Sequence, residues 1–315
     1  MAGVRADPAD LRGDRAVGRP ARDVRRAPRG PGRRTARRER RWCGRAAGRR
    51  RAAYAGRRAR RRMSDPHALP PGEAAFTRIL RPLGFRLNGR YPLDKLGMTG
   101  RAYAHEDAPD EIAQFFVSEL HPERFSKEFQ QAVTNVVSSS RDPLSPAAVA
   151  LLWEVEREGW LSLEAAHALL PEIVGAFARQ HDVPNELDYE TLLMESAEMA
   201  WIATEGNAFN HATDRVADVF KLSDDEKAKG RPMKPEVERS RSGRVFQTAY
   251  RADTVEREFR TRDGGTVKRN VPGSFYEFIT RKRTFDQAAR RWVTDLRFDA
   301  GNAQGIFKMT ANAAK

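Results

Sequence analysis

The spacing of apolar residues divides the chain after residue 71 into three parts. In "GEAAFTRILRPLGF" the apolar residues Ala75, Ile79 and Leu80 fall on one face at helical spacing, and Pro82 and Gly84 end the helix. The segments "RAYAHED" and "EIAQFFVSEL" alternate apolar and polar residues as strands do, with the turn signal "DAPD" between them. The first part is therefore predicted to be a helix followed by strands.

The second part, residues 124–202, has apolar residues spaced near 3.6 in four segments, which predicts an inserted block of about four helices. Ser145, Ser162 and Asn185 stand where helix N-caps are expected, because their side-chain oxygens accept from free backbone N–H groups. The last segment, "ELDYETLLMESAEMAWIATEG", is predicted to be one helix. The tryptophans of this block are expected in its core: Trp153, Trp160 and Trp201.

Strand patterns return in the third part, in "NAFNHATDRV", "RVFQTAYRA", "TVEREFRTRD", "TVKRNV" and "SFYEFITRK". The "DGG" at 263–265 is predicted to be the hairpin turn between the third and fourth of these strands, because no glycine pattern of a phosphate-binding loop accompanies it. The order of β-rich, α-rich and β-rich parts predicts an α+β fold with a helical insertion, in a single domain over residues 63–315.

Composition sets residues 1–62 apart from the rest of the chain. They contain 23 Arg, no Lys and 5 acidic residues, a net charge of +18, whereas the remaining residues carry −4. Val4, Leu11, Val17 and Val24 are their only Leu, Ile or Val residues, which is too little apolar surface to offset the entropy of ordering. We expect this segment to be disordered.

Four interpretations of this arginine-rich segment remain. Three are a nucleic-acid-binding arm that neutralises phosphates, an organelle-targeting peptide, and a solvated tail. The fourth, which we favour, is a misread or frame-shifted start, because Arg, Ala, Gly and Pro without Lys are what GC-rich DNA encodes in an unselected frame. Native sequence is then expected to resume between Met63 and Ala75.

Cysteine content and hydropathy favour a cytoplasmic protein. The single cysteine, Cys43, excludes an intramolecular disulfide, and no run of about 18 apolar residues exists to span a bilayer. The sequence does not indicate an oligomeric state.

Two residues of the third part break the local apolar pattern and are candidates for chemistry. In "SFYEFITRK" the alternation places Glu277 among apolar neighbours on either face, and a buried carboxylate must be paired, protonated or bound to a metal. Arg281 and Arg283 are its alternative partners. In "FNHATDR" His211 lies on the same face as Phe209, where a metal ligand and a hydrogen-bonded core histidine both fit.

Five stretches carry a resemblance to a known family: "YPLDKLGMTGRAYAHED", "IAQFFVSELHPERFS", "AFNHATDRV", "VFQTAY" and "VPGSFYEFITRKR". In this order, and over roughly residues 74–310, the chain resembles the 2-oxoadipate dioxygenase/decarboxylases, also called 2-hydroxyglutarate synthases. The resemblance implies the vicinal-oxygen-chelate βαβββ plan with an added helical block. It also implies a mononuclear Fe(II) that is held by two histidines and one glutamate.

The implied reaction is the conversion of 2-oxoadipate, or a similar 2-oxo dicarboxylic acid, to 2-hydroxyglutarate and carbon dioxide. A site of two histidines and one carboxylate leaves positions open on iron, enough for a 2-oxo acid and dioxygen. In the family both atoms of dioxygen end in the hydroxy acid. The implied partners are therefore a 2-oxo acid and dioxygen.

Carried over residue by residue, the resemblance makes His211 the second histidine ligand and Glu277 the carboxylate ligand, with no catalytic residue beyond the metal ligands. The family places the first ligand in a His-x-x-x-Arg motif, which this sequence lacks near its expected position. His67 in "DPHALPPGE" is the candidate, although the residue four positions later is Pro. Arg215 and Gln247 are candidates for substrate binding, with a rim ion pair and a cross-strand hydrogen bond as their structural alternatives.

Two classes of function follow. The first, which we favour, is the iron-dependent oxygenase, impaired if its first ligand is missing. The second is a non-catalytic, basic-armed relative of the enzyme that binds nucleic acid or a protein partner. Another metal-dependent reaction on the same fold is a third possibility, because a fold does not determine chemistry.

Overall fold

The computed structural model describes residues 69–288 and 290–298, which belong to one unit of the chain. The arginine-rich segment 1–62 and the candidate ligand His67 lie outside the described residues. Within the described part, the predicted α+β class with a helical insertion is confirmed. No helix of this part is long and apolar enough to cross a bilayer.

Helix α2 (Glu73–Leu80) opens the described part and leads into a three-stranded antiparallel sheet. The sheet has the order β1-β2-β3, with β1 (Phe85–Leu93), β2 (Met98–His105) and β3 (Phe115–Leu120). One-turn 3-10 helices follow β1 and β3, at η1 (Asp94–Leu96) and η2 (Pro122–Arg124). Leu80 of α2 packs with Phe85, Tyr103 and Val117 of the sheet in one apolar cluster.

The helical block contains five α-helices: α3 (Lys127–Val137), α4 (Pro146–Glu158), α5 (Leu163–Ala176), α6 (Glu186–Glu195) and α7 (Ala197–Glu205). The predicted N-caps are confirmed. The side chains of Ser145, Ser162 and Asn185 each accept a hydrogen bond from a backbone N–H in the first turn of α4, α5 and α6.

The prediction of one helix over residues 186–206 was wrong, because the chain breaks at Ser196. Ser196 has an extended backbone (φ −148°, ψ 107°), and its hydroxyl accepts from the N–H of Met199. It therefore ends α6 and caps α7. A serine competes with the helix for backbone hydrogen bonds in this way, and the apolar spacing on both sides of it does not reveal the break.

The expected burial of the three tryptophans holds for one of them. Trp201 on α7 is 7% exposed, and its indole Nε1 donates to the carbonyl oxygen of Gly273. Trp153 and Trp160, however, are 68% and 66% exposed. α4 buries the face that carries Ala148 and Leu152 against α2 and α5, and Trp153 lies outside this face. Trp160 follows the end of α4 at Glu158.

The second sheet has four strands in the order β4-β9-β6-β5: β4 (His211–Arg215), β9 (Phe275–Arg281), β6 (Val245–Ala249) and β5 (Glu238–Arg239). β4 runs parallel to β9, and β6 runs antiparallel to it. The strand predicted from residue 207 begins only at His211, because Asn207 donates its backbone N–H to Ala178 and stays outside the ladder. Helix α8 (Val219–Ala228) follows β4.

Two antiparallel ribbons complete the described part: β7 (Thr254–Arg260) with β8 (Thr266–Pro272), and β10 (Arg283–Asp286) with β11 (Arg291–Thr294). The predicted turn at 263–265 is confirmed between β7 and β8, where Gly264 has a φ of +84°. Phe259 and Val271 of this ribbon are buried in the cluster formed by α3, α6 and α7. The helical block and the last third of the chain therefore share a core.

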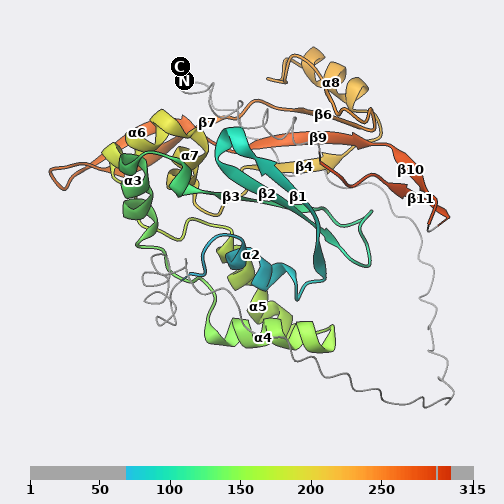
Figure 1. Ribbon diagram of the computed structural model, residues 1–315, viewed down its shortest axis with the longest axis horizontal. Helices are drawn as coiled ribbons and strands as arrows, with labels where there is room; N and C mark the ends of the chain where they lie inside the picture. Colours follow the sequence, from blue (N-terminus) through green and yellow to red (C-terminus); the bar gives the residue numbers. More distant parts are fainter. Residues whose placement is uncertain (1–68, 289, 299–315) are drawn as a thin grey trace, which may run out of the picture. The chain divides into compact units, whose positions relative to one another are not determined.

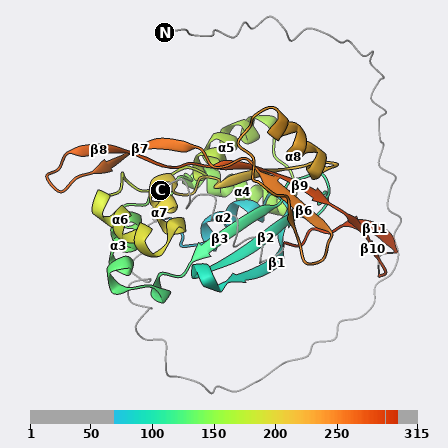
Figure 2. The ribbon, with the colours of Figure 1, turned by 90° about the horizontal axis from the view of Figure 1, so that it is seen from above.

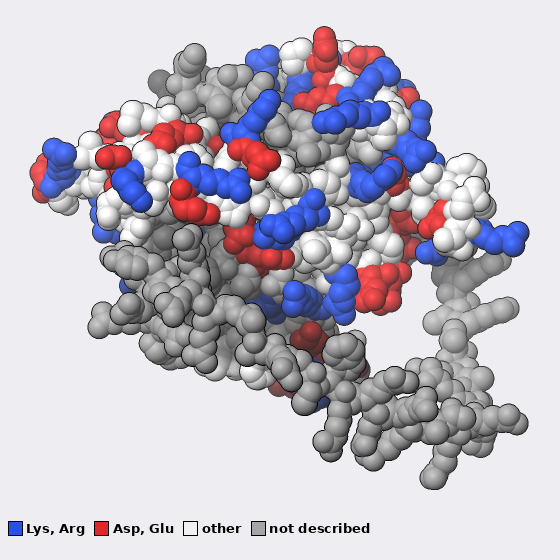
Figure 3. All heavy atoms as spheres, in the orientation of Figure 1, with Lys and Arg blue, Asp and Glu red and all other residues white. Residues whose placement is uncertain are grey.

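Figures 1 and 2 show the arrangement of these elements. The β7–β8 ribbon lies beside α3 and α6 at one end, and the β10–β11 ribbon extends at the other. α2 lies between the three-stranded sheet and the α4–α5 pair. On the face drawn in Figure 3, basic and acidic side chains of the described residues are interspersed.

Candidate metal and substrate site

His211 and Glu277 come from adjacent strands of the four-stranded sheet. In the parallel register His211 pairs with Phe275 and Thr213 pairs with Glu277. Because side chains alternate between the two faces of a strand, His211, Thr213 and Glu277 project from the same face. His211 and Glu277, which are 66 positions apart in the sequence, are thus brought to the same face by the pairing of β4 with β9.

Glu277 is the most deeply buried acid of this face, with 3% of its surface exposed. The hydroxyl of Thr213 donates a 2.9 Å hydrogen bond to Oε2. Oε1 is buried and has no hydrogen-bond partner among the described residues. Burial raises the pKa of Glu277 to about 7, and the hydrogen bond from Thr213 opposes this rise. An unsatisfied buried carboxylate oxygen is costly unless a ligand completes it.

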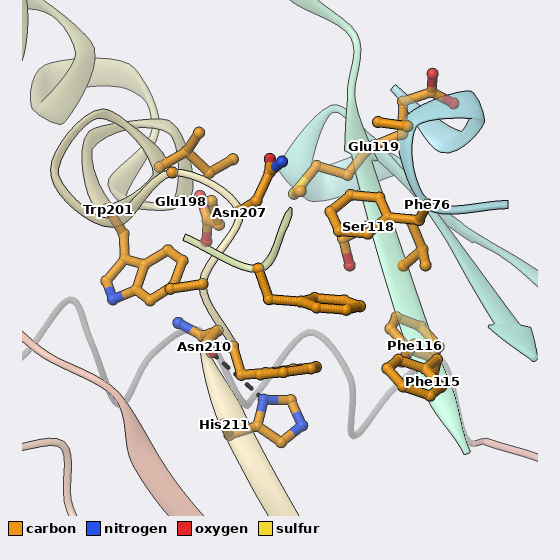
Figure 4. Close-up of a pocket in the computed structure, with 18 of the residues that line it drawn as sticks. Phe76, Phe115, Phe116, Ser118, Glu119, Glu198, Trp201, Asn207, Asn210 and His211 are labelled. Atoms are coloured by element: carbon orange, nitrogen blue, oxygen red, sulfur yellow. Dashed lines mark hydrogen bonds between the residues drawn. The ribbon is translucent and has the colours of Figure 1, made fainter. Parts of the chain in front are cut away.

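The His211 ring stacks on Phe275, with the ring centroids 4.9 Å apart and the planes at 13°. Its Nδ1 lies 3.4 Å from Oδ1 of Asn210, the contact drawn as a dashed line in Figure 4. Burial, and then the positive charge of Lys234, lowers the pKa of His211 to about 4. The imidazole is therefore neutral at neutral pH, which is the form that binds a metal.

Both residues line a cavity of about 1030 Å³. Figure 4 shows His211 and Asn210 at one end, Trp201 and Glu198 of α7 on one side, and Phe115 of β3 on the other. Four phenylalanines form an aromatic wall, in which Phe177 stacks on Phe209 and Phe115, and Phe76 contacts Phe177: the centroid separations are 4.8, 5.8 and 5.8 Å. The cavity is thus bounded by both sheets, α2 and the helical block.

Comparison with known proteins supplies the family. Residues 68–310 match the family described as 2-oxoadipate dioxygenase/decarboxylase. The chain belongs to this family. A search of curated proteins found no match.

Solved structures of related proteins agree with this membership. The chain is 63% identical to a putative glyoxalase superfamily protein from Ralstonia eutropha, over 76% of this chain and 72% of that one, with a TM-score of 0.70. It shares the fold of the hydroxyglutarate synthase from Oryza sativa, solved with 2-oxoadipate (18% identity, 77% of each chain, TM-score 0.56). It also shares that of the Pseudomonas putida enzyme (20% identity, 77% of this chain and 58% of that one, TM-score 0.54).

A metal site of two histidines and one carboxylate needs a third protein ligand, which the described residues do not supply. Among residues 69–288 and 290–298, no three His, Cys, Asp or Glu side chains are grouped closely enough to hold a metal ion. Three of the described histidines other than His211 are engaged elsewhere: His105 accepts from the N–H of Ala108, His121 bonds Thr99, and Nε2 of His181 lies 2.9 Å from the carbonyl oxygen of Ala203. His167 is exposed on α5. The candidate His67 lies outside the described residues.

Of the two residues predicted to bind substrate, Arg215 lines the cavity and Gln247 does not. Arg215 forms part of the cavity wall, and its guanidinium donates to the carbonyl oxygens of Pro109 and Asp110. Gln247 is buried on the same face of the sheet as Glu277, and its amide donates a 2.9 Å hydrogen bond to Glu238. Gln247 is not one of the residues that line the cavity.

Thr213 was not singled out from the sequence as part of this site, and Arg281 was considered only as an ion-pair partner of Glu277. In the structure Thr213 holds Glu277, and Arg281, at the end of β9, lines the cavity. The sequence did contain a clue, because residues two or four apart on a strand share a face: Thr213 follows His211 by two residues, and Arg281 follows Glu277 by four. Which strands pair, and in which register, was needed to place them together.

Proposed function

We propose that this chain is an Fe(II)-dependent dioxygenase/decarboxylase that converts 2-oxoadipate and dioxygen to 2-hydroxyglutarate and carbon dioxide. Membership of the family supports the reaction class. The observation that carries the proposal is the pair of donor atoms on one cavity wall: the neutral imidazole of His211 and the unpartnered Oε1 of Glu277.

The two residues fit iron by the chemistry of their donors. An imidazole and a carboxylate are two of the three ligands in iron sites of two histidines and one carboxylate. We propose His67 as the third. When bound, iron supplies the open positions at which a 2-oxo acid and dioxygen react.

The chain's own residues prepare this site in three ways. Phe275 fixes the plane of the His211 ring by stacking. Thr213 donates to Oε2 of Glu277 and leaves Oε1 without a partner, free to bind a ligand. The aromatic wall of Phe115, Phe177 and Phe209 limits the access of water, which protects a reactive site from side reactions.

The proposal is tested on the full chain, loaded with Fe(II) without oxygen and then mixed with 2-oxoadipate and oxygenated buffer. Oxygen consumption, carbon dioxide release and 2-hydroxyglutarate formation are measured together. We expect equal amounts of all three. His211→Ala and Glu277→Gln are expected to abolish both iron binding and turnover.

His167→Ala is the matched control, because His167 is exposed on α5 and outside the cavity. This variant should bind iron and turn over like the unaltered chain. Turnover that survives both His211→Ala and Glu277→Gln would overturn the assignment of these residues, and a chain that binds iron but releases no carbon dioxide would overturn the reaction.

A further inference from the structure

Phe298 separates the large cavity from a second, smaller one. It lines both the cavity that holds His211 and Glu277 and a pocket of about 330 Å³, and it is the one described residue that the two linings share. The small pocket is bounded by β1, by the turn that leads into β6 and by the segment after β11. Its wall includes the polar side chains of Ser240 and Ser242.

Two further aromatic rings hold the Phe298 ring between the two cavities. The Phe298 ring centroid lies 4.9 Å from that of Phe116, which lines the large cavity, and 5.9 Å from that of Tyr91, which lines the small pocket. Tyr91 and Phe116 also contact each other, with their centroids 5.8 Å apart. Rings at these separations attract one another. The three residues form an aromatic partition.

Gly100 on β2 makes room for this partition. Gly100 pairs with Tyr91 of β1 and with Ser118 of β3. Tyr91 and Phe116 therefore project from the face on which a side chain at residue 100 would lie. A Cβ at Gly100 would be 2.3 Å from Cζ of Phe116. The two rings thus meet over the central strand because that strand has a glycine between them.

Polar contacts fix the segment that carries Phe298. The backbone N–H of Phe298 donates to the hydroxyl oxygen of Tyr91 (3.1 Å). Arg281 donates through Nη1 to the carbonyl oxygens of Asp295 (2.8 Å) and Arg297 (2.9 Å). The Arg281 guanidinium also lies 5.0 Å from the centroid of the Phe298 ring. Strands β1 and β9 therefore both determine where this ring lies.

The aromatic partition stands at the end of the cavity away from Glu277. Arg281, which contacts the Phe298 ring, is the last residue of β9 and follows Glu277 by four residues. Four residues of strand span about 13 Å. An extended six-carbon diacid with a polar contact of about 3 Å at each end spans about 12 Å, and two more methylenes add roughly 2.5 Å. An eight-carbon diacid would therefore need the space that Phe298 fills.

We infer that Phe298 is a specificity-determining residue, whose ring ends the substrate cavity and sets the longest 2-oxo acid that the cavity accepts. This inference rests on the proposed function for the reacting end at His211 and Glu277, and it adds what limits the other end. Removal of the ring joins the small pocket to the large cavity. The hydroxyl groups of Ser240 and Ser242 then become part of the wall that meets the polar end of a longer acid.

Binding without turnover tests the partition independently of iron chemistry. Calorimetry on the full chain compares suberate, an eight-carbon diacid, with adipate, which has six carbons. Phe298→Ala should bind suberate at least about 10-fold more tightly than the unaltered chain does, because two further methylenes leave water. Its affinity for adipate should not increase.

Three variants serve as comparisons. Phe298→Leu, which keeps an apolar side chain and so guards against a folding defect in Phe298→Ala, should gain affinity for suberate in the same direction. Phe298→Trp keeps a ring at the partition and should gain none. Phe285→Ala is the matched control, because Phe285 lies on β10 and lines neither cavity. It should bind both diacids like the unaltered chain.

Turnover gives the second readout, with 2-oxosuberate against 2-oxoadipate. The longer acid and dioxygen would give 2-hydroxypimelate and carbon dioxide. Phe298→Ala should raise the ratio of kcat/KM for 2-oxosuberate to that for 2-oxoadipate by at least about 10-fold, mainly through KM. If no 2-oxo acid is turned over but Phe298→Ala still gains affinity for suberate, the proposed function fails and the partition stands. No gain for suberate in the Ala and Leu variants, or an equal gain in Phe298→Trp or Phe285→Ala, overturns the partition.

Discussion

Thr213 on β4 and Glu277 on β9 are direct partners in the parallel pair, and the Thr213 hydroxyl donates a 2.9 Å hydrogen bond to Oε2 of Glu277. Only one carboxylate oxygen is engaged in this way, since Oε1 has no partner among the described residues. The bond restricts rotation of the carboxylate and leaves Oε1 as the oxygen without a partner. Groups that orient a metal ligand affect metal affinity although they do not touch the metal.

Replacement of Thr213 by Val is therefore expected to weaken metal binding. The methyl group preserves the shape of the side chain but removes the hydroxyl, so that the Glu277 carboxylate can rotate. We expect a loss of about 10-fold in Fe(II) affinity, the lower range for loss of such an orienting contact, measured by competition with a chelator. Thr213→Ser keeps the hydroxyl and should keep the affinity. Equal losses in the Val and Ser variants would contradict an orienting role.

His181 predicts how stability depends on pH. It is buried, its Nε2–H donates to Ala203, and burial lowers its pKa below 6.5. In the unfolded chain the residue binds a proton as the pH falls through 6.5, whereas in the folded chain it stays neutral until lower pH. The free energy of unfolding should therefore decrease as the pH falls below this value.

Urea unfolding at several pH values between about 5 and 7.5 measures this dependence. His181→Gln, which keeps an N–H donor but does not titrate, should have a flatter profile than the unaltered chain. His167→Gln, at an exposed position on α5, should leave the profile as it is. An identical slope in the His181 variant would show that other groups cause the acid sensitivity.

The tryptophans of the helical block are expected to differ sharply in their contribution to stability. Trp201 is buried against the cavity and bonds Gly273, whereas Trp153 is 68% exposed. Trp201→Ala should lower the free energy of unfolding by about 3–5 kcal/mol, as large-to-small core substitutions do. Trp153→Ala should change it by less than about 0.5 kcal/mol. Chemical unfolding of the two variants, measured side by side, tests the contrast.

Gly206 is expected to be intolerant of a side chain. It has a φ of +66° at the end of α7, and an added Cβ would lie 2.4 Å from Cα of Arg179. Gly206→Ala should lose more than about 1 kcal/mol of stability and disturb the loop that leads to His211, because backbone has to move. Gly159→Ala is the control, with a φ of +78° and open space around the Cβ. A loss of the same size in both variants would leave only backbone strain as the cause.

Local features of this fold were predictable from the sequence because near neighbours decide them. The caps at Ser145 and Ser162 and the turn at 263–265 depend on contacts within a few residues. The break at Ser196 is also local, but it was missed because the apolar spacing continues across it. Exposure of Trp153 was missed for a different reason, since burial depends on which elements pack against a helix.

The sequence by itself determined the α+β order and the helical insertion, because the spacing of apolar residues differs between strands and helices. It also identified His211 and Glu277 as unusual, because both interrupt this spacing and both lie in stretches that resemble the family. Only the tertiary structure decided that β4 and β9 pair in parallel with Thr213 opposite Glu277. It also decided that Arg215 and Arg281 meet at one cavity wall. These contacts join residues more than sixty positions apart, and the register between two strands is selected by the burial of their shared face and not by the local pattern of either strand.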